Sequence, residues 1–348
     1  MPSPNGSGYS TTEGPNPRSL DTPSPSGSGY STTEGRNEDG TPAPSWRGLP
    51  RTPKEGLVRA IGVNTWVWTS PLTDANLPDL LRHVAALGFD AVELPLENVG
   101  DLSPGPTRAV LAETGLTPYV VGAMAPGRDL VATDPRTVAS TQDYVRGCID
   151  LASAIGAASV CGPFYAQTGR VWRLDDDARA AAYDEWRTHL APVVSYADER
   201  GVRIGIEPLN RYETSLVNTV DQALEGLGPL LGPGLGLALD TYHLNIEERS
   251  SVAAVRRAGE HLVHVQVCGS DRGAPGGDQT DWPALLTALD EVGYTGPLNI
   301  ESFTPDNAAI AVAASIWRPL AASPDDLARD GLAFLRSVRP AAPTGGTR

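Results

Sequence analysis

Three carboxylates stand at the points where strand-like segments of the sequence end. Glu207 follows the segment RIGI, Asp240 closes GLGLALD, and Glu301 follows PLNI. Carboxylates gathered in one partly buried place repel each other, and burial without a counter-charge raises their pKa values. A divalent cation removes this conflict, and oxygen ligands of this kind suit Mn²⁺, Mg²⁺ or Co²⁺. The three residues therefore indicate a metal site, provided that the fold brings these segment ends together.

The segment LVHVQVC, residues 262–268, offers a fourth ligand. Strand alternation places His264 and Gln266 on one face, with three valines on the other. An imidazole nitrogen or an amide oxygen could complete the set, so either residue is a candidate. Gln266 is level with the other segment ends, whereas His264 stands one two-residue step, about 7 Å, deeper. We therefore predict Gln266 as the metal ligand and His264 as a packing group or a support behind the ligands.

More polar residues follow the same segments. Glu213 lies in the loop EPLNRYE, His243 lies in LDTYHLNIEE, and Arg272 lies in the glycine-rich stretch GSDRGAPG. Taken singly, the two charged residues could be solvated loop charges and the histidine could cap a helix. Gathered around a metal ion, a carboxylate, an imidazole and a guanidinium are suitable donors and acceptors for a polyol substrate.

Such a site needs a fold that brings strand ends to one place. The chain alternates strand-like and helix-like segments eight times, with the strand candidates at residues 61–68, 91–97, 118–125, 158–165, 203–210, 234–240, 262–268 and 297–303. Eight such units in about 285 residues match the size of a (β/α)8 TIM barrel, whose active site lies at the carboxyl ends of the strands. An open, doubly wound sheet is the alternative, but no GxGxxG follows the first strand segment.

The two ends of the chain have a different composition from the barrel region, 56–340. Residues 1–55 are rich in Gly, Ser, Pro and Thr, and PSPNGSGYSTTEG at 2–14 returns as PSPSGSGYSTTEG at 23–35. Such a segment has too little apolar area to offset the entropy of ordering it, so we expect a disordered extension. A peptide that binds a partner is the alternative. Residues 341–348 are expected to be a disordered C-terminus.

Charge and composition exclude several classes of function. The net charge of −15 repels nucleic acid and anionic membranes, so we expect neither as a partner. Lys54 is the single lysine and precedes the barrel region, which excludes Schiff-base catalysis by a barrel lysine. Three cysteines without CxxC spacing are typical of reduced thiols, and no signal-like N-terminus or long apolar run is present. We expect a cytoplasmic protein.

Several of these stretches resemble one known family. GVNTWVWTSPLTD, GFDAVELPLE, GPFYAQTGR, IEPLNRYET, LDTYHLNIEE, GSDRGAPG and IESF are similar to motifs of the xylose-isomerase-like sugar isomerases and epimerases. The resemblance is greatest to the ketose 3-epimerases that act on D-tagatose and D-psicose. It covers roughly residues 60–338, and the duplicated segment near the N-terminus has no counterpart in it.

The resemblance implies a role for each candidate residue. Glu207 and Glu301 match the glutamates that bind metal and move the proton at carbon 3, while Asp240 matches a ligand with no second role. The residues that match those holding the C1 and C2 end of the substrate are Glu213, His243 and Arg272. At the fourth ligand position these epimerases usually carry the second histidine of His-x-His. This chain has Gln266 there, as in the hydroxypyruvate isomerase branch, and His264 takes the first position.

The expected function is therefore a metal-dependent epimerase that inverts carbon 3 of a free ketose of the D-psicose, D-fructose or D-tagatose type. The reaction would pass through a cis-enediolate with two glutamates as acid and base. Another enediolate enzyme is the alternative: an aldose-ketose isomerase, a hydroxypyruvate isomerase or an inosose dehydratase. A noncatalytic sugar- or peptide-binding barrel is the third possibility. We expect Mn²⁺ before Co²⁺ or Mg²⁺ as the metal, and the resemblance implies a homodimer or tetramer.

Overall fold

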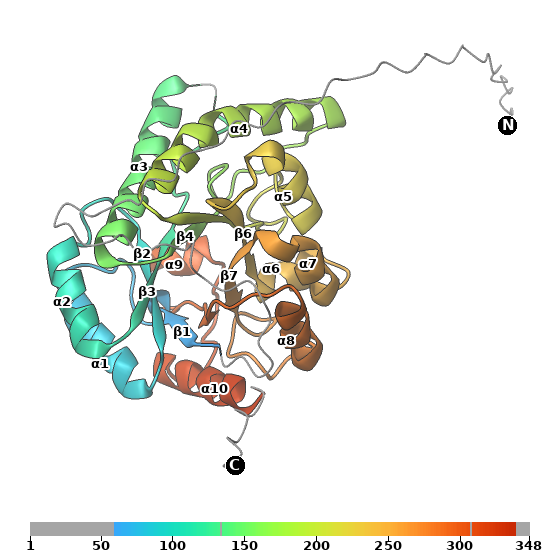
Figure 1. Ribbon diagram of the computed structural model, residues 1–348. Coiled ribbons are helices and arrows are strands. Elements are labelled where there is room, and N and C mark those ends of the chain that lie inside the picture. Colours follow the sequence, from blue (N-terminus) through green and yellow to red (C-terminus); the bar gives the residue numbers. More distant parts are fainter. Residues whose placement is uncertain (1–58, 133, 307, 339–348) are drawn as a thin grey trace, which may run out of the picture. The chain divides into compact units, whose positions relative to one another are not determined.

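Eight parallel strands form a closed barrel in chain order, each followed by helical or loop segments (Figure 1). The computed structural model describes residues 59–132, 134–306 and 308–338. The strands are β1 (Ile61–Asn64), β2 (Ala91–Leu96), β3 (Thr117–Gly122), β4 (Ser159–Gly162), β5 (Arg203–Ile206), β6 (Leu235–Asp240), β7 (Leu262–Val267) and β8 (Leu298–Ile300). The (β/α)8 TIM barrel expected from the alternating pattern is confirmed, and the doubly wound sheet is excluded.

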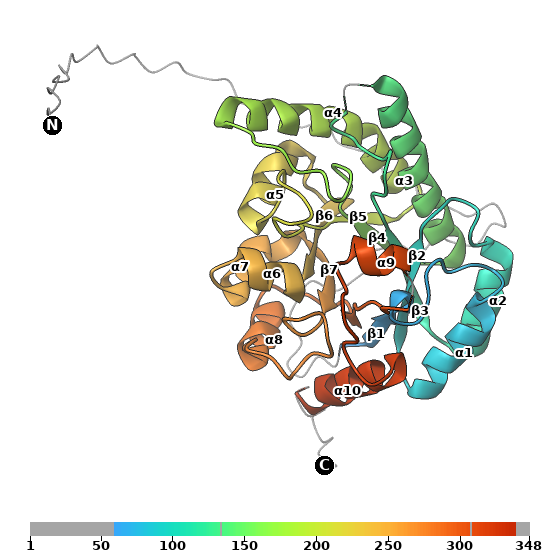
Figure 2. The same cartoon turned by 180° about the vertical axis from the view of Figure 1, so that it is seen from behind.

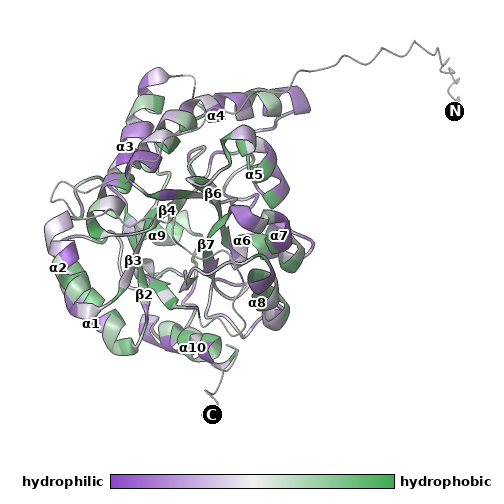
Figure 3. Ribbon diagram, in the orientation of Figure 1, coloured by the Kyte–Doolittle hydropathy of each residue, from purple (hydrophilic) through white to green (hydrophobic). Residues whose placement is uncertain are grey.

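Helices surround the strands. Figure 2 shows the barrel from behind, with α9 in front of the strands. The α-helices are α1 (Leu77–Leu87), α2 (Pro104–Thr114), α3 (Pro135–Ile155), α4 (Asp176–Glu199), α5 (Val220–Leu227), α6 (Thr241–Glu247), α7 (Ser251–Ala258), α8 (Trp282–Glu291), α9 (Ala308–Ala313) and α10 (Pro324–Ser337). Short 3-10 turns are η2 (Thr65–Val67), η3 (Gly228–Leu230) and η4 (Gly259–His261). Outer helices such as α2 and α10 carry both hydrophobic and hydrophilic residues, as amphipathic helices require (Figure 3).

The strands separate bulky aliphatic residues from small and polar ones. Ile204 and Ile206 of β5 belong to the main hydrophobic core, whereas Gly205 lies between them in the sequence and so faces the other side of the sheet. A Cβ at Gly205 would lie 3.2 Å from the Cβ of Ala238 on β6, so the interior of the barrel is narrow here. The alternation sends the aliphatic residues outward under the helices and leaves the polar residues of the strands inside.

Strand register places the polar residues at defined heights. Asp240 of β6 pairs with Gln266 of β7, and Gln266 pairs with Asn299 of β8. On the other side of the closure, Asn64 of β1 pairs with Glu93 of β2. Because Asp240 and Gln266 are direct neighbours, the expected level position of these two side chains is confirmed.

Several strands are shorter than predicted. The first was expected over 61–68 but ends at Asn64, because the Asn64 side chain accepts a hydrogen bond from the Trp66 backbone N–H and starts the turn η2. The fourth ends at Gly162, although Phe164 and Tyr165 after it are fully buried. Buried apolar residues in loops continue the hydrophobic pattern beyond the last ladder pair, so the pattern alone cannot locate the end of a strand.

The predicted disordered ends, 1–55 and 341–348, lie outside the described residues, as do the outermost residues of the predicted barrel region 56–340. Among the described residues no helix is long and apolar enough to cross a lipid bilayer. The three cysteines, Cys148, Cys161 and Cys268, are buried free thiols.

Candidate active site

The three predicted carboxylates meet at the carboxyl end of the barrel. Glu207 directly follows β5, Asp240 ends β6, and Glu301 directly follows β8. Their residues are only 5 %, 1 % and 4 % exposed. Ligand atoms of Glu207, Asp240 and His243 lie within 4.8 Å of one another, so these three residues could hold a metal ion. The barrel therefore gathers in one place carboxylates that lie far apart in the sequence.

Arg272 joins two of these carboxylates. Its Nη1 donates to Oε2 of Glu301 over 2.9 Å and also to Oδ2 of Asp240. The guanidinium lies 4.3 Å from the centre of the Tyr242 ring, and the residue is 4 % exposed. Its backbone is left-handed, with φ of 68°, and its carbonyl accepts a hydrogen bond from Ser302 over 2.6 Å. This residue was expected to hold substrate, and the structure places it among the carboxylates.

His243 lies in α6 and is oriented by the loop after β5. The backbone N–H of Asn210 donates to its Nδ1 over 3.0 Å, so the neutral ring carries its proton on Nε2. That nitrogen lies 3.4 Å from Oε1 of Glu207 and 3.1 Å from Nη2 of Arg272. Burial lowers the pKa of His243, which favours the neutral form. With the proton on Nε2, the imidazole can donate toward Glu207, and the guanidinium of Arg272 lies beside it.

Glu213 belongs to the same group through Asn210. The side-chain amide of Asn210 donates to Oε1 of Glu213 over 2.7 Å and also lies 3.0 Å from Nδ1 of His243. Glu213 is half-buried, whereas the neighbouring Tyr212 is exposed. The three residues predicted to contact substrate are therefore close to the carboxylates, with Glu213 the most open to solvent.

The carboxylates differ in their affinity for protons. Burial, followed by the charge of Asp240, raises the pKa of Glu207 well above its ordinary value. Burial and the charge of Glu207 likewise raise the pKa of Glu301, against the opposing charge of Arg272. Burial also opposes ionisation of Asp240, but Arg272 and His243 hold the pKa of that carboxyl below its ordinary value. In the chain without a bound cation, Glu207 and Glu301 therefore bind protons more readily than Asp240 does.

Glu93 lies behind the candidate ligands, and the sequence analysis missed it. It lies in the middle of β2, is fully buried, and accepts hydrogen bonds from Asn64 and Gln266. Its Oε1 lies 2.5 Å from Nε2 of His264. The sequence did contain a signal for Glu93, which is the only charged residue in the apolar segment AVELPL. An inward-facing charge in a barrel strand needs polar partners.

Gln266 and His264 differ in what they contact. The Nε2 of Gln266 donates to Oε1 of Glu301 over 2.7 Å and to Oε2 of Glu93 over 3.1 Å. Among the described residues, Oε1 of Gln266 and Nδ1 of His264 are buried atoms without a hydrogen-bond partner. The unpartnered amide oxygen next to the carboxylates fits a hard divalent cation, which binds such oxygens. The donors that could hold one are carboxylate oxygens of Glu207, Asp240 and Glu301, and Oε1 of Gln266.

A second cluster lies deeper in the barrel. Ligand atoms of Glu93, Cys161 and His264 approach one another within 4.8 Å. Burial raises the pKa of the Cys161 thiol well above its ordinary value, and its Sγ lies 3.8 Å from the carbonyl of Val120. Because Glu93 already accepts from two side-chain amides and contacts an imidazole, hydrogen bonds account for this cluster.

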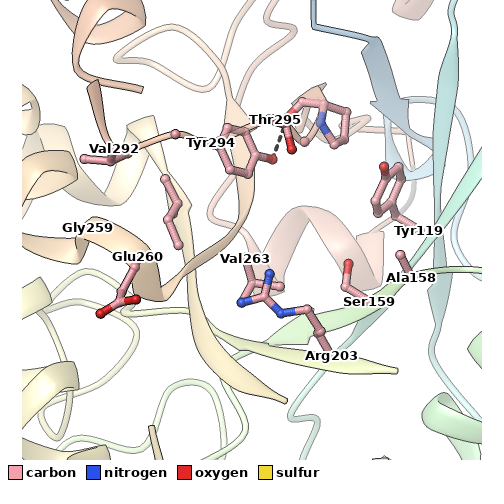
Figure 4. Close-up of a pocket in the computed structure, with 14 residues that line it drawn as sticks. Tyr119, Ala158, Ser159, Arg203, Gly259, Glu260, Val263, Val292, Tyr294 and Thr295 are labelled. Carbon is pink, nitrogen blue, oxygen red and sulfur yellow. Dashed lines mark hydrogen bonds between the residues drawn. The ribbon is translucent and has the colours of Figure 1, made fainter. Parts of the chain in front are cut away.

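The opposite end of the barrel contains a cavity of about 280 Å³. It is lined by the first residues of three strands, Ser159, Arg203 and Leu262, and by Tyr119 of β3 (Figure 4). Burial raises the pKa of Tyr119 to about 12. None of the predicted site residues lines this cavity, so it is separate from the carboxylate cluster.

Comparisons with known proteins agree on one group. A family model described as xylose isomerase-like TIM barrel matches residues 81–338. The chain is 31 % identical over 278 residues to a ketose 3-epimerase of Arthrobacter globiformis, covering 79 % of this chain and 95 % of the relative. It is 29 % identical over 280 residues to an L-ribulose 3-epimerase of a Methylomonas species, covering 79 % and 96 %. The crystal structure of a Methylomonas D-allulose 3-epimerase in complex with D-allulose superposes with a TM-score of 0.73, at 29 % identity, covering 81 % and 97 %.

Proposed function

The chain belongs to the xylose isomerase-like TIM barrels and to their ketose 3-epimerase branch, and we propose that it inverts carbon 3 of a free ketose. This membership also confirms the expected enzyme class, an isomerase. The observation that carries the proposal is the pair Glu207 and Glu301, both buried and each directly after one of two strands that are not neighbours in the barrel. Two proton-transferring groups approaching carbon 3 from different sides are what inversion requires.

In the proposed reaction, one glutamate is ionised and takes the proton from carbon 3, which leaves a planar cis-enediolate. The other glutamate is protonated and returns a proton to the opposite face, so the carbon is inverted. The placement of the two carboxyls supports this division, because Glu207 and Glu301 follow strands that are not neighbours and are both buried in the site. A single base on one face would regenerate the starting ketose.

The substrate oxygens at C1 and C2 would be held by the group around His243. Its Nε2–H and the guanidinium of Arg272 are adjacent donors, and Glu213 supplies an acceptor that Asn210 orients. To bind substrate, Arg272 exchanges part of its contact with the carboxylates for contact with the sugar. The barrel region has no lysine, which favours a free sugar over a sugar phosphate.

A divalent cation held by Glu207, Asp240, Glu301 and Oε1 of Gln266 would polarise the C2 carbonyl and stabilise the negative charge that develops on its oxygen. Support for this ligand set comes from its oxygen donors and from the unpartnered amide oxygen. We propose Mn²⁺, with Co²⁺ or Mg²⁺ as alternatives. His264 would stay behind the ligands. The homodimer or tetramer and the cytoplasmic location remain predictions.

Solvent exchange at carbon 3 tests the proposed reaction. The Mn²⁺-loaded chain is incubated in D₂O with fructose, psicose, tagatose or sorbose, and deuterium is located by NMR. We expect exchange at C3 together with formation of the C3 epimer. Exchange confined to C1 or C2 would instead support an aldose-ketose isomerase, and loss of water a dehydratase. Binding without turnover, unchanged by Glu207→Gln or Glu301→Gln, would support a noncatalytic barrel.

A further inference from the structure

We propose that Glu93 is a positioning residue of this site, which fixes the amide of Gln266 so that its oxygen, and not its nitrogen, faces the ligand of the carboxylate cluster. The inference rests on the proposed function in one respect, the metal ion that the amide oxygen would bind. Glu93 itself would touch neither the ion nor the sugar, and would act through its neighbours.

Side chains from two strands surround the carboxylate of Glu93. Its Oε2 accepts from Nδ2 of Asn64 over 2.8 Å and from Nε2 of Gln266 over 3.1 Å, and its Oε1 lies 2.5 Å from Nε2 of His264. All four residues are 0 % exposed. One carboxylate thus connects three neighbouring side chains from β1 and β7, in a place where water does not compete for its hydrogen bonds.

Hydrogen bonds fix the orientation of the Gln266 amide. Its Nε2 lies between two carboxylates, that of Glu93 at 3.1 Å and that of Glu301 at 2.7 Å. Carboxylate oxygens accept hydrogen bonds, and only the nitrogen end of an amide donates them. Both carboxylates therefore hold Nε2, and Oε1 is left buried without a partner. A buried acceptor without a partner is costly, so this arrangement implies that a ligand satisfies the oxygen.

Without Glu93, the amide of Gln266 would lose one of the two carboxylates that hold it. Glu301 is itself a proposed ligand and acid or base, so its bond to Gln266 would change during metal binding and turnover. Glu93 has neither proposed role, so its bond to Gln266 would be kept. If it were replaced by a group that does not accept hydrogen bonds in the same way, the amide could turn over and present Nε2 to the cation. Partners that orient a metal ligand typically contribute about 10- to 100-fold to metal affinity.

The variant Glu93→Gln tests this in the full-length chain, with Mn²⁺ affinity measured by titration calorimetry. We expect Mn²⁺ binding to weaken about 10- to 100-fold. The matched control is Glu97→Gln, which makes the same change directly after β2, where the Glu97 carboxylate bonds Trp66 and Ser70. The control should keep the wild-type affinity within about twofold. If Glu93→Gln does not fold, Glu93→Asp keeps the carboxylate with a shorter reach and should show an intermediate loss.

A double-mutant cycle separates positioning from general support of the fold. Gln266→Ala removes the amide through which Glu93 would act, so Glu93→Gln/Gln266→Ala should bind Mn²⁺ as weakly as Gln266→Ala alone. Additive losses would overturn the inference. So would a second bound ion per chain that Glu93→Gln removes, because the cluster with Cys161 and His264 would then be a metal site.

The same experiments distinguish failure of the inference from failure of the proposed function. A wild-type chain that binds Mn²⁺ and gives the non-additive cycle, but exchanges no ketose at C3, would contradict the proposed reaction and support positioning. Exchange at C3 together with additive losses would do the reverse. A chain that binds none of Mn²⁺, Co²⁺ and Mg²⁺ would overturn the inference.

Discussion

The guanidinium nitrogen Nη1 of Arg272 lies 2.9 Å from Oε2 of Glu301, and the same nitrogen bonds Asp240. A fixed positive charge therefore stands between two of the residues that we propose as metal ligands. Because both cations would be attracted by the same carboxylates, the arginine and a bound divalent ion would compete.

This competition predicts the effect of Arg272→Met. Removing the guanidinium should tighten Mn²⁺ binding on the order of tenfold, since one repulsive charge near the ion is lost. The KM for the ketose should rise at the same time, because a donor to the sugar is lost. Calorimetry and steady-state kinetics measure the two effects. Arg318→Met is the control, because Arg318 is largely exposed and pairs with Asp271. Weaker Mn²⁺ binding in Arg272→Met would contradict the prediction.

Glu207→Gln and Glu301→Gln should each lower kcat by about 100-fold or more. The amide keeps the size of the side chain but can neither accept nor release the C3 proton. Glu213→Gln serves for comparison and should mainly raise KM, because we propose that Glu213 holds the sugar and does not move its proton. Deuterium exchange at C3 and steady-state rates are measured for all three. If either catalytic variant kept wild-type kcat with C3 exchange, that glutamate would not move the proton.

The raised pKa values of Glu207 and Glu301 predict how stability depends on pH in the metal-free chain. Between the ordinary value of 4.5 and the raised folded value, the folded state binds more protons than the unfolded state. Their contribution to stability is therefore present below pH 4.5 and is lost as the pH rises through the folded pKa. We expect Glu301→Gln, which cannot ionise, to gain Tm relative to wild type as the pH rises above 4.5. A Tm difference that does not change with pH would contradict this.

His243 and Asp240 change the stability with pH in the opposite direction. Comparing wild type with Glu301→Gln at each pH therefore isolates the contribution of Glu301 to stability. Burial lowers the pKa of His243 from 6.5, so its contribution is lost as the pH falls below 6.5. Despite burial, Arg272 and His243 lower the pKa of Asp240 from 3.8, so its contribution is lost as the pH falls below 3.8.

Chelation should lower the stability of the chain. An ion that binds only the folded state adds about 2.7 kcal/mol when its free concentration is 100 times its Kd. Treatment with EDTA should therefore lower Tm, and added Mn²⁺ should restore it. Calorimetric scans measure both steps. In Asp240→Asn, which removes one proposed ligand charge, the rise in Tm on adding Mn²⁺ should be much smaller, and a rise equal to that of wild type would exclude Asp240 as a ligand.

Much of the fold and of the site could be predicted because the strand pattern is regular. The eightfold alternation of strand-like and helix-like segments was sufficient to place Glu207, Asp240 and Glu301 at one end of a barrel, and the structure brings them together there. Alternation also placed Gln266 level with Asp240, which the register confirms. These inferences depend only on the local geometry of strands, which can be predicted from a short stretch of sequence.

The contacts between side chains could not be predicted in the same way. Glu93 and Gln266 are 173 residues apart, and no local pattern relates β2 to β7. Arg272 contacts the carboxylates from a residue with a left-handed backbone, a conformation that the residue type does not favour. Such relationships arise from closure of the barrel and the course of its loops, and neither is contained in a single segment.

The closure of the barrel also has a consequence for how the chain is made. The barrel closes when β1 pairs with β8, and Asn64 then bonds Glu301, 237 residues later in the sequence. While the ribosome is still adding the last strand, β1 has no partner on that side and the site lacks one of its carboxylates. The two glutamates that we propose as acid and base therefore come together only after nearly the whole chain has left the exit tunnel. A chain truncated before residue 298 should be a substrate for chaperones and proteases rather than a partly active enzyme.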